Sequence, residues 1–238
     1  MKRTLTLPTI LLLAAPAALC AADAASRNPP RGDRPPPNFV VLFADDMGYS
    51  DLACYGNPVI RTPNLDRMAA EGTRFTSFYS AAPVCTPSRV GLLTGRYPTR
   101  AGQPNNTGPN TVGGLPLSEI LLPQVLKQRG YRTMAIGKWH LGYKPREYLP
   151  ISRGFDQWFG LPYSNDMIPP WVQTNVPLQL YRNGGAIEEV GDQSQLTVRY
   201  AAEAQRFIRE SKGSPFFLYV PFAMPHLPVS APENMRGR

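Results

Sequence analysis

The residues best suited to chemistry form the run Cys85-Thr86-Pro87-Ser88-Arg89, which puts one cysteine at the start of a predicted helix. Thr86 is a suitable N-cap, and Pro87 suits the first helical turn because its φ is already helical. Unpaired amides at a helix N-terminus favour an anion, and Arg89 adds a permanent cation one turn later. The run therefore predicts an oxyanion site, although a buried cysteine beside a capped helix would show the same spacing.

A pair of carboxylates follows the first long apolar run after the N-terminal region. Residues 38–44 are typical of a buried strand in a parallel sheet, and Asp45 and Asp46 stand at its carboxyl end, where α/β sheets place ligands. Adjacent aspartates repel each other unless a cation or hydrogen bonds compensate. Their hard oxygens favour Ca²⁺ or Mg²⁺ over a soft metal. A solvated turn is the alternative for an isolated pair.

Both histidines of the chain also follow predicted strands. Lys138 and His140 come after the strand 131–136, and their side chains would point the same way if that strand continued through them. His226 follows the apolar run 215–220. A lone Lys-x-His pair is more often a surface feature, so these residues become candidates because of their place at strand ends.

The size and charge of the chain limit the classes of function that it can have. Its 238 residues suffice for one α/β domain or for part of a larger one. A formal net charge of +8 suits acidic substrates. No basic run is interleaved with aromatic residues, which argues against nucleic-acid binding.

The N-terminal region predicts export. Lys2 and Arg3 precede a short apolar core and Ala-rich sequence, so residues 1–25 are interpreted as a secretory signal peptide rather than a membrane span. Residues 26–37 are rich in Pro and Arg and are typical of a linker, and residues 38–238 would form the catalytic domain. The expected location is the periplasm or the extracellular space.

Local patterns predict the remaining elements. Helices are expected at 62–72, 123–129 and 194–211, a strand at 73–80, a β-rich excursion at 169–191, and loops at 101–114 and 154–166. The two segments 101–114 and 169–191 would carry substrate specificity, and Cys54 is expected to be a packing residue.

Several of these strings resemble type I sulfatases in the expected order. Cys85 to Arg89, with the Leu-Thr-Gly-Arg that follows, is similar to the sulfatase signature, and Gly-Lys-Trp-His-Leu-Gly at 137–142 matches a second family string. The aromatic loop 154–166 looks like the branch of arylsulfatase A and N-acetylgalactosamine-6-sulfatase. The resemblance implies an α/β, alkaline-phosphatase-like fold with a mostly parallel sheet flanked by helices.

The same resemblance implies a site, residue by residue. Cys85 would be converted to Cα-formylglycine (3-oxoalanine) by a formylglycine-generating enzyme. Asp45, Asp46 and the oxygen at position 85 would hold a divalent cation. Roles in catalysis or substrate contact would fall to Arg89, Lys138, His140, Ser164 and His226.

The implied reaction is hydrolysis of a sulfate ester in two covalent steps. One hydroxyl of the aldehyde hydrate at position 85 attacks sulfur and expels the substrate alcohol, and loss of a proton from the second hydroxyl ejects sulfate. Arg89 would hold the hydrate and Lys138 would neutralise the sulfate charge. His140 would accept the proton, and His226 would assist the leaving oxygen. The substrate would be a sulfated small molecule or glycan.

The resemblance extends from residue 38 to the end of the chain, yet two family features are missing from it. Sulfatases of this branch carry a later Asp-Asn pair on the cation and a later lysine on the sulfate, and neither follows His226 here. The chain thus resembles the N-terminal part of a sulfatase, and its fold would be incomplete on the C-terminal side. We expect weak Ca²⁺ binding, exposed apolar sheet edges, and a chain that is unstable or inactive alone.

Two other functions fit the sequence less well. A non-catalytic sulfatase remnant would bind anionic polymers through the basic surface. A phosphatase or phosphodiesterase relative would use the unmodified Cys85 thiol, but Pro87 and Arg89 match the recognition sequence for formylglycine formation.

Overall fold

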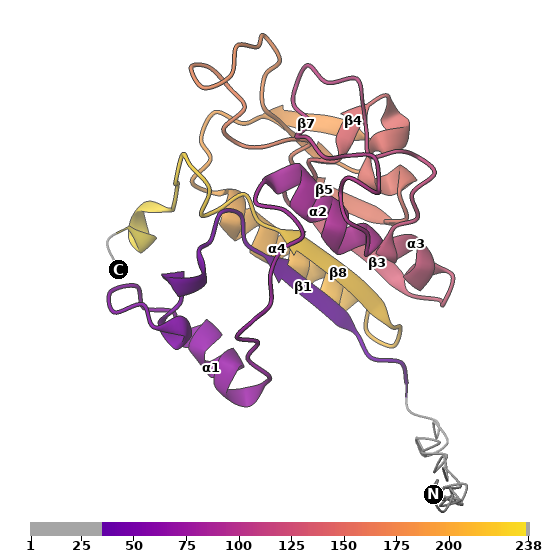
Figure 1. Cartoon of the computed structure of the whole chain (residues 1–238). Coiled ribbons are helices and arrows are strands. Elements are labelled where there is room, and N and C mark those ends of the chain that lie inside the picture. The colour runs from indigo at the N-terminus through magenta and orange to yellow at the C-terminus, as the bar shows by residue number, and fades with distance from the viewer. Residues whose placement is uncertain (1–34, 237–238) are drawn as a thin grey trace, which may run out of the picture. The chain divides into compact units, whose positions relative to one another are not determined.

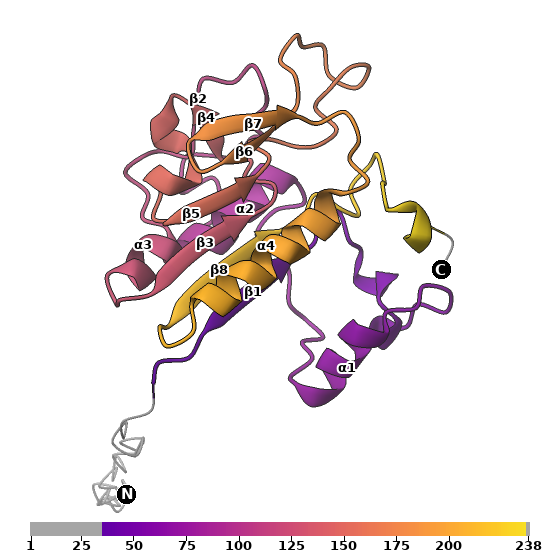
Figure 2. The same cartoon turned by 180° about the vertical axis from the view of Figure 1, so that it is seen from behind.

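The computed structural model describes residues 35–236 and shows a sheet with helices on both faces (Figures 1 and 2). Six strands lie in the order β1-β8-β3-β5-β6-β7. Their bounds are β1 Phe39–Phe43, β3 Arg132–Ile136, β5 Gln157–Gly160, β6 Gln179–Arg182, β7 Gly185–Glu189 and β8 Phe216–Pro221. The first four strands in this order run parallel, and β6 and β7 are antiparallel. The predicted α/β, mostly parallel sheet is confirmed.

Four α-helices accompany the sheet in the described residues. They are α1 Pro63–Glu71, α2 Cys85–Thr94, α3 Leu122–Lys127 and α4 Leu196–Glu210. Helices α2 and α3 cover the face turned to the viewer in Figure 1, and α4 covers the opposite face, as Figure 2 shows. A short antiparallel pair, β2 (Gly113–Gly114) and β4 (Gly142–Lys144), lies beyond β5.

The interior of the sheet holds the core. All six residues of β8 are buried, and β3 is buried from its second residue onward. Helix α4 is amphipathic and buries Leu196, Tyr200 and Phe207, so the apolar positions of the predicted helix 194–211 mostly face the sheet. Ile208 is an exception, because 41% of it is exposed.

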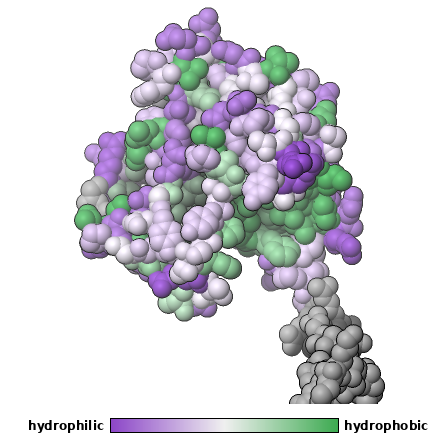
Figure 3. All heavy atoms as spheres, viewed as in Figure 1, coloured by the Kyte–Doolittle hydropathy of each residue, from purple (hydrophilic) through white to green (hydrophobic). Residues whose placement is uncertain are grey.

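Strand β1 is an edge strand, and much of its apolar surface is exposed. Phe39, Val40 and Leu42 are 42%, 47% and 52% exposed. Figure 3 shows an apolar surface along this strand. The expected apolar sheet edge is therefore present, whereas the expectation that residues 38–44 form a buried strand is wrong for these side chains.

Three other local predictions are wrong. Residues 73–80 form no strand, because the carbonyl groups of Phe75 and Thr76 accept hydrogen bonds from tyrosine hydroxyls rather than from a neighbouring strand. The segment 154–166 contains β5, which lies between β3 and β6. Helix α2 begins at Cys85, so the N-cap position belongs to Val84 and not to Thr86.

The predicted signal peptide and most of the predicted linker lie outside the described residues. Within residues 35–236, no helix combines the length and apolarity that a membrane span requires.

Candidate functional site

The candidate site lies where the carboxyl ends of β1, β3 and β8 meet. Phe43 of β1 is in register with Pro221 of β8, so the residues that follow each strand come together. Gly137, directly after β3, has φ +125°, and a Cβ there would collide with the carbonyl group of Pro221. Glycine thus allows the close approach in which the Lys138 N–H donates to the Pro221 carbonyl oxygen at 2.8 Å.

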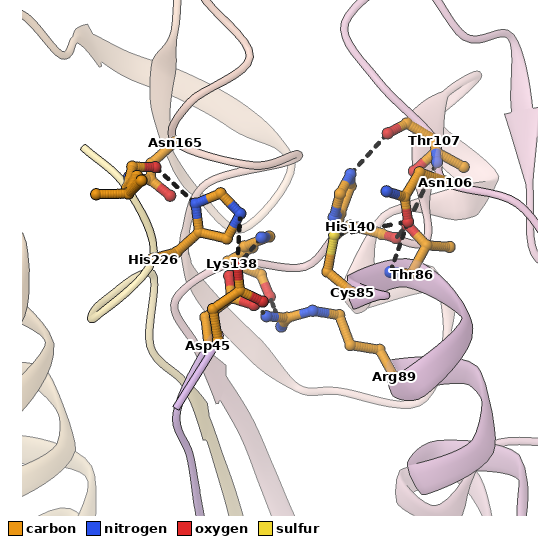
Figure 4. A network of polar contacts seen from close by, with 12 residues as sticks. Asp45, Cys85, Thr86, Arg89, Asn106, Thr107, Lys138, His140, Asn165 and His226 are labelled. Carbon is orange, nitrogen blue, oxygen red and sulfur yellow. Dashed lines mark hydrogen bonds and ion pairs between the residues drawn. The ribbon is translucent and has the colours of Figure 1, made fainter. Parts of the chain in front are cut away.

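Asp45, Lys138 and Arg89 form a buried ionic group at this point (Figure 4). The Asp45 carboxylate accepts a hydrogen bond from Lys138 Nζ and lies 3.4 Å from Arg89 Nη2. Arg89 Nη1 also donates to the Lys138 carbonyl oxygen at 2.6 Å. Burial and the neighbouring Arg89 cation lower the pKa of Lys138, and the Asp45 carboxylate opposes that shift.

Cys85 is the first residue of α2, and a loop side chain covers it. Asn106 Oδ1 accepts a hydrogen bond from the Thr86 N–H at 3.0 Å and lies 3.5 Å from Cys85 Sγ. Asn106 therefore satisfies a backbone donor at the helix start that the prediction left to an anion. The Thr86 hydroxyl instead donates to the His140 carbonyl oxygen at 2.7 Å.

His140 is fully buried and held in one orientation. Strand β3 ends at Ile136 and His140 has φ 58°, so the expected continuation of the strand through Lys138 and His140 is wrong. His140 Nε2 lies 2.6 Å from the Thr107 carbonyl oxygen. Because a carbonyl only accepts, Nε2 carries the hydrogen and Nδ1 carries the lone pair of the neutral ring. Nδ1 has no hydrogen-bond partner among the described residues.

The electrostatic surroundings keep the His140 ring neutral. Burial is the main cause that holds its pKa well below 6.5, and the cations of Lys138 and Arg89 lower it further. A neutral imidazole with a free lone pair can accept a proton.

His226 and Asp46 form a second, more open pair. His226 Nε2 lies 3.2 Å from Asp46 Oδ2, and the Asp46 side chain is 61% exposed while that of His226 is 16% exposed. Asp46 has φ 57°, which turns its side chain away from the direction of Asp45. The structure thus places the two aspartates in different surroundings, one buried among cations and one near solvent.

Ser164 is buried, and its Oγ has no hydrogen-bond partner within the described part of the chain. Its neighbour Asn165 was not predicted. Asn165 Nδ2 donates to Gln193 Oε1 at 3.0 Å, and Gln193 Nε2 donates to the Asn165 carbonyl oxygen at 2.9 Å. This reciprocal pair fixes the loop that carries Ser164 against the segment before α4.

A family model described as Sulfatase matches residues 37–237. The chain belongs to the sulfatase family. N-acetylgalactosamine-6-sulfatase of Rattus norvegicus is 45% identical over 224 residues, covering 85% of this chain and 42% of that protein. Arylsulfatase G of Homo sapiens is 42% identical over 238 residues, covering 87% of this chain and 45% of that protein.

Solved sulfatase structures share the fold. The crystal structure of PsFucS1 sulfatase from Pseudoalteromonas sp. is 33% identical and superposes with a TM-score of 0.69, covering 82% of this chain and 46% of that chain. The alkaline-phosphatase-like architecture is therefore confirmed. This sulfatase-family chain spans less than half the length of the curated relatives it matches.

The acidic residues supply the type of ligand that a divalent cation takes, but too few of them. Asp45 and Asp46 offer the oxygen ligands that Ca²⁺ or Mg²⁺ takes. Among residues 35–236, however, no group of three or more His, Cys, Asp or Glu side chains is placed to hold a metal ion. Asp45 is already balanced by Lys138 and Arg89. The described residues thus offer two carboxylates, fewer oxygen ligands than a Ca²⁺ ion takes.

Sequence reasoning missed Asn106, Thr107 and Asn165. Thr107 acts through its main-chain carbonyl, which any residue type would supply. Asn106 is 21 residues from Cys85 in a loop with no regular pattern. No local signal in the sequence could have placed it at the start of α2.

Proposed function

We propose that this chain forms part of a hydrolase that cleaves sulfate monoesters, with Cys85 as the precursor of formylglycine. The observation that carries the proposal is a buried excess of positive charge next to Cys85. Two cations, Lys138 and Arg89, share one carboxylate, Asp45. Buried charges need partners, so this group has capacity for one more anion.

The hydrogen-bond donors of Arg89 also support an anion site at this place. Arg89 Nε is buried and has no hydrogen-bond acceptor among the described residues, and Nη2 makes only the 3.4 Å ion pair with Asp45. Buried unpaired donors are costly, and a sulfate oxygen would satisfy them with charge-assisted bonds. Lys138 would contribute a second point of positive charge, which suits the several oxygens of one sulfate group.

The two histidines suit the two proton transfers that ester hydrolysis requires. His140 is neutral, with its lone pair on Nδ1, so it can take a proton from the group at position 85. His226 has its Nε2 on the Asp46 carboxylate at the open side of the site, where a leaving alcohol could receive a proton. Arg89, whose Nη1 donates to the Lys138 carbonyl oxygen, would hold the reacting group.

Position 85 needs a hydroxyl nucleophile rather than a thiol, because a thiol that attacked sulfur would leave an adduct without an easy exit. Formylglycine, when hydrated, supplies that hydroxyl and a second one whose deprotonation releases sulfate. A formylglycine-generating enzyme is therefore the proposed maturation partner. Cys85 is partly accessible in the folded chain.

Asp45 and Asp46 would be the ligands of a divalent cation, with Ca²⁺ the first choice and Mg²⁺ possible, because both ions take carboxylate oxygens. A bound cation would polarise a sulfate oxygen. With two carboxylates only, we expect weak binding by the isolated chain, and sulfatase turnover to require further ligands.

The substrate is proposed to be a sulfated sugar or another small sulfate ester, and the protein to be exported. The support for a sugar is the 45% identity to a relative whose name specifies N-acetylgalactosamine 6-sulfate. The net charge of +8 suits a sulfated glycan.

The test is turnover of a chromogenic aryl sulfate by protein that carries this chain and is produced together with a formylglycine-generating enzyme. We expect Cys85→Ala to abolish turnover and Cys54→Ala, the matched control at the other described cysteine, to retain it. Equal turnover by Cys85→Ala, or hydrolysis of aryl phosphate by the unmodified thiol instead of aryl sulfate, would contradict the proposal.

A further inference from the structure

Trp171 stands apart from the other two tryptophans of the chain. Trp139 and Trp158 are each 1% exposed, whereas Trp171 is 58% exposed. It lies on the long connection between β5 and β6. A large aromatic ring that faces solvent lacks the free energy that burial would give it. When the loop around such a ring is ordered, its exposure suggests that the ring binds a ligand.

The loop that carries Trp171 is anchored at both ends. Met167 and Ile168 before it, and Val176 after it, pack against the core. The Val172 N–H donates to the Ile168 carbonyl oxygen at 3.1 Å, which closes a turn around Trp171. The apolar residues on both sides thus face inward, and the indole ring is held outward.

A second loop ties Trp171 to the candidate site. Asn110 Oδ1 accepts a hydrogen bond from the Thr174 hydroxyl at 3.1 Å, and Asn110 Nδ2 lies 3.5 Å from the Gln173 carbonyl oxygen. Asn110 follows Thr107 by three residues, and Thr107 contacts both His140 and Thr86. The same short loop therefore borders Cys85 at one end and the Trp171 loop at the other.

The chemistry of this surface suits a sugar ring. An indole face packs against the apolar C–H face of a pyranose, and the exposed amides of Asn105, Asn110 and Gln173 can bond its hydroxyl groups. We propose that Trp171 is a stacking platform for a sugar residue of a sulfated glycan whose sulfate occupies the site at Cys85. This inference rests on the proposed function and specifies its substrate class as an oligosaccharide.

The indole fluorescence of Trp171 can be followed selectively, because acrylamide quenches exposed indoles and the other two tryptophans are buried. The experiment measures acrylamide quenching of the full chain with and without a sulfated tetrasaccharide, and compares it with the matching sulfated monosaccharide. Affinities for both ligands are then measured by calorimetry for Trp171→Ala and for Trp171→Phe. Tyr97→Ala is the matched control, since Tyr97 is another exposed aromatic, 71% exposed, just after α2.

We expect the tetrasaccharide to shield Trp171 from acrylamide, Trp171→Ala to weaken tetrasaccharide binding roughly tenfold, and Trp171→Phe to retain most of it. Monosaccharide binding and the Tyr97→Ala variant should be unchanged. Equal tetrasaccharide affinity in Trp171→Ala and the parent chain would contradict the stacking role of Trp171. It would not contradict the proposed sulfate site. If neither sulfated ligand binds, the proposed function fails, and the platform fails with it.

Discussion

Strands β1 and β8 are hydrogen-bonded neighbours with similar apolar sequences, yet their surroundings differ. In β8 every residue is buried, whereas in β1 none is. The difference arises because β8 lies between two strands and under α4, while β1 has a partner on one side only. An apolar run thus predicts a strand, but its burial depends on elements that lie elsewhere in the chain.

Helices α4 and α1 show the same contrast. Helix α4 buries three large apolar residues against the sheet, and α1 buries none, although apolar residues recur along one face of it. The segment that contains α1 also exposes Phe75, Phe78 and Tyr79, which are 63%, 74% and 82% exposed. Helix α1 and the segment after it thus expose apolar side chains of the kind that α4 buries against the sheet.

The candidate site contains residues from both the exposed edge strand β1 and the buried part of the chain. Asp45 follows the exposed strand β1, while its partners Lys138 and Arg89 come from the buried part of the chain. The buried ionic group therefore adds to the packing of Val41 and Phe43 in holding the end of the edge strand.

A matched pair of leucines tests the contrast between β8 and β1 most strongly. Leu218→Ala removes a side chain that is 0% exposed and should lower the free energy of unfolding by about 3 kcal/mol. Leu42→Ala, at a residue 52% exposed, should lower it by less than about 0.5 kcal/mol. Urea denaturation followed by circular dichroism measures both, and equal losses would contradict the burial difference.

Lys138→Ala should be the next largest effect. It removes the buried, charge-assisted hydrogen bond from Lys138 Nζ to the Asp45 carboxylate, and should cost about 2 kcal/mol of unfolding free energy. Lys127→Ala is the matched control, because its ion pair with Asp156 is near the surface. A loss in Lys138→Ala no greater than in Lys127→Ala would show that the buried group does not hold β1.

His140 predicts how stability depends on pH. Folding lowers its pKa below 6.5, so below that pH the unfolded chain binds protons more readily than the folded chain. The contribution of His140 to stability is complete above pH 6.5 and declines as the pH falls toward the lowered value. Urea midpoints for the parent chain and for His140→Gln should converge as the pH is lowered, and parallel curves would contradict a neutral buried ring.

Asn106→Ala should have a smaller effect, since it removes one cap at the start of α2. We expect a loss of about 1 kcal/mol in unfolding free energy, because the Thr86 N–H loses its acceptor. Asn105→Ala, at the exposed neighbouring residue, should change stability little. The same denaturation assay compares them, and similar values for both variants would rule out a capping role for Asn106.

The sequence predicts those features that short segments determine. The apolar run 215–220 and the periodic pattern of 194–211 correspond to β8 and α4 with boundaries shifted by one or two residues. The strand ends also brought Asp45, Lys138 and His226 to one edge of the sheet, as parallel topology requires.

Features that depend on distant partners could not be predicted. The pairing of Asn106 with Cys85, the reciprocal amide pair of Asn165 and Gln193, and the exposure of β1 each depend on contacts between segments far apart in the chain. The left-handed backbone at His140 likewise follows from its packing and not from its residue type.

The most direct test of the account is the mass of the peptide that contains position 85, from chain produced together with a formylglycine-generating enzyme. If Cys85 is the precursor of formylglycine, we expect the mass loss that accompanies conversion of a thiol to an aldehyde, capture of that peptide by a hydrazide probe, and an unchanged thiol at Cys54. An unmodified thiol at Cys85 under conditions that convert a known sulfatase would contradict the account.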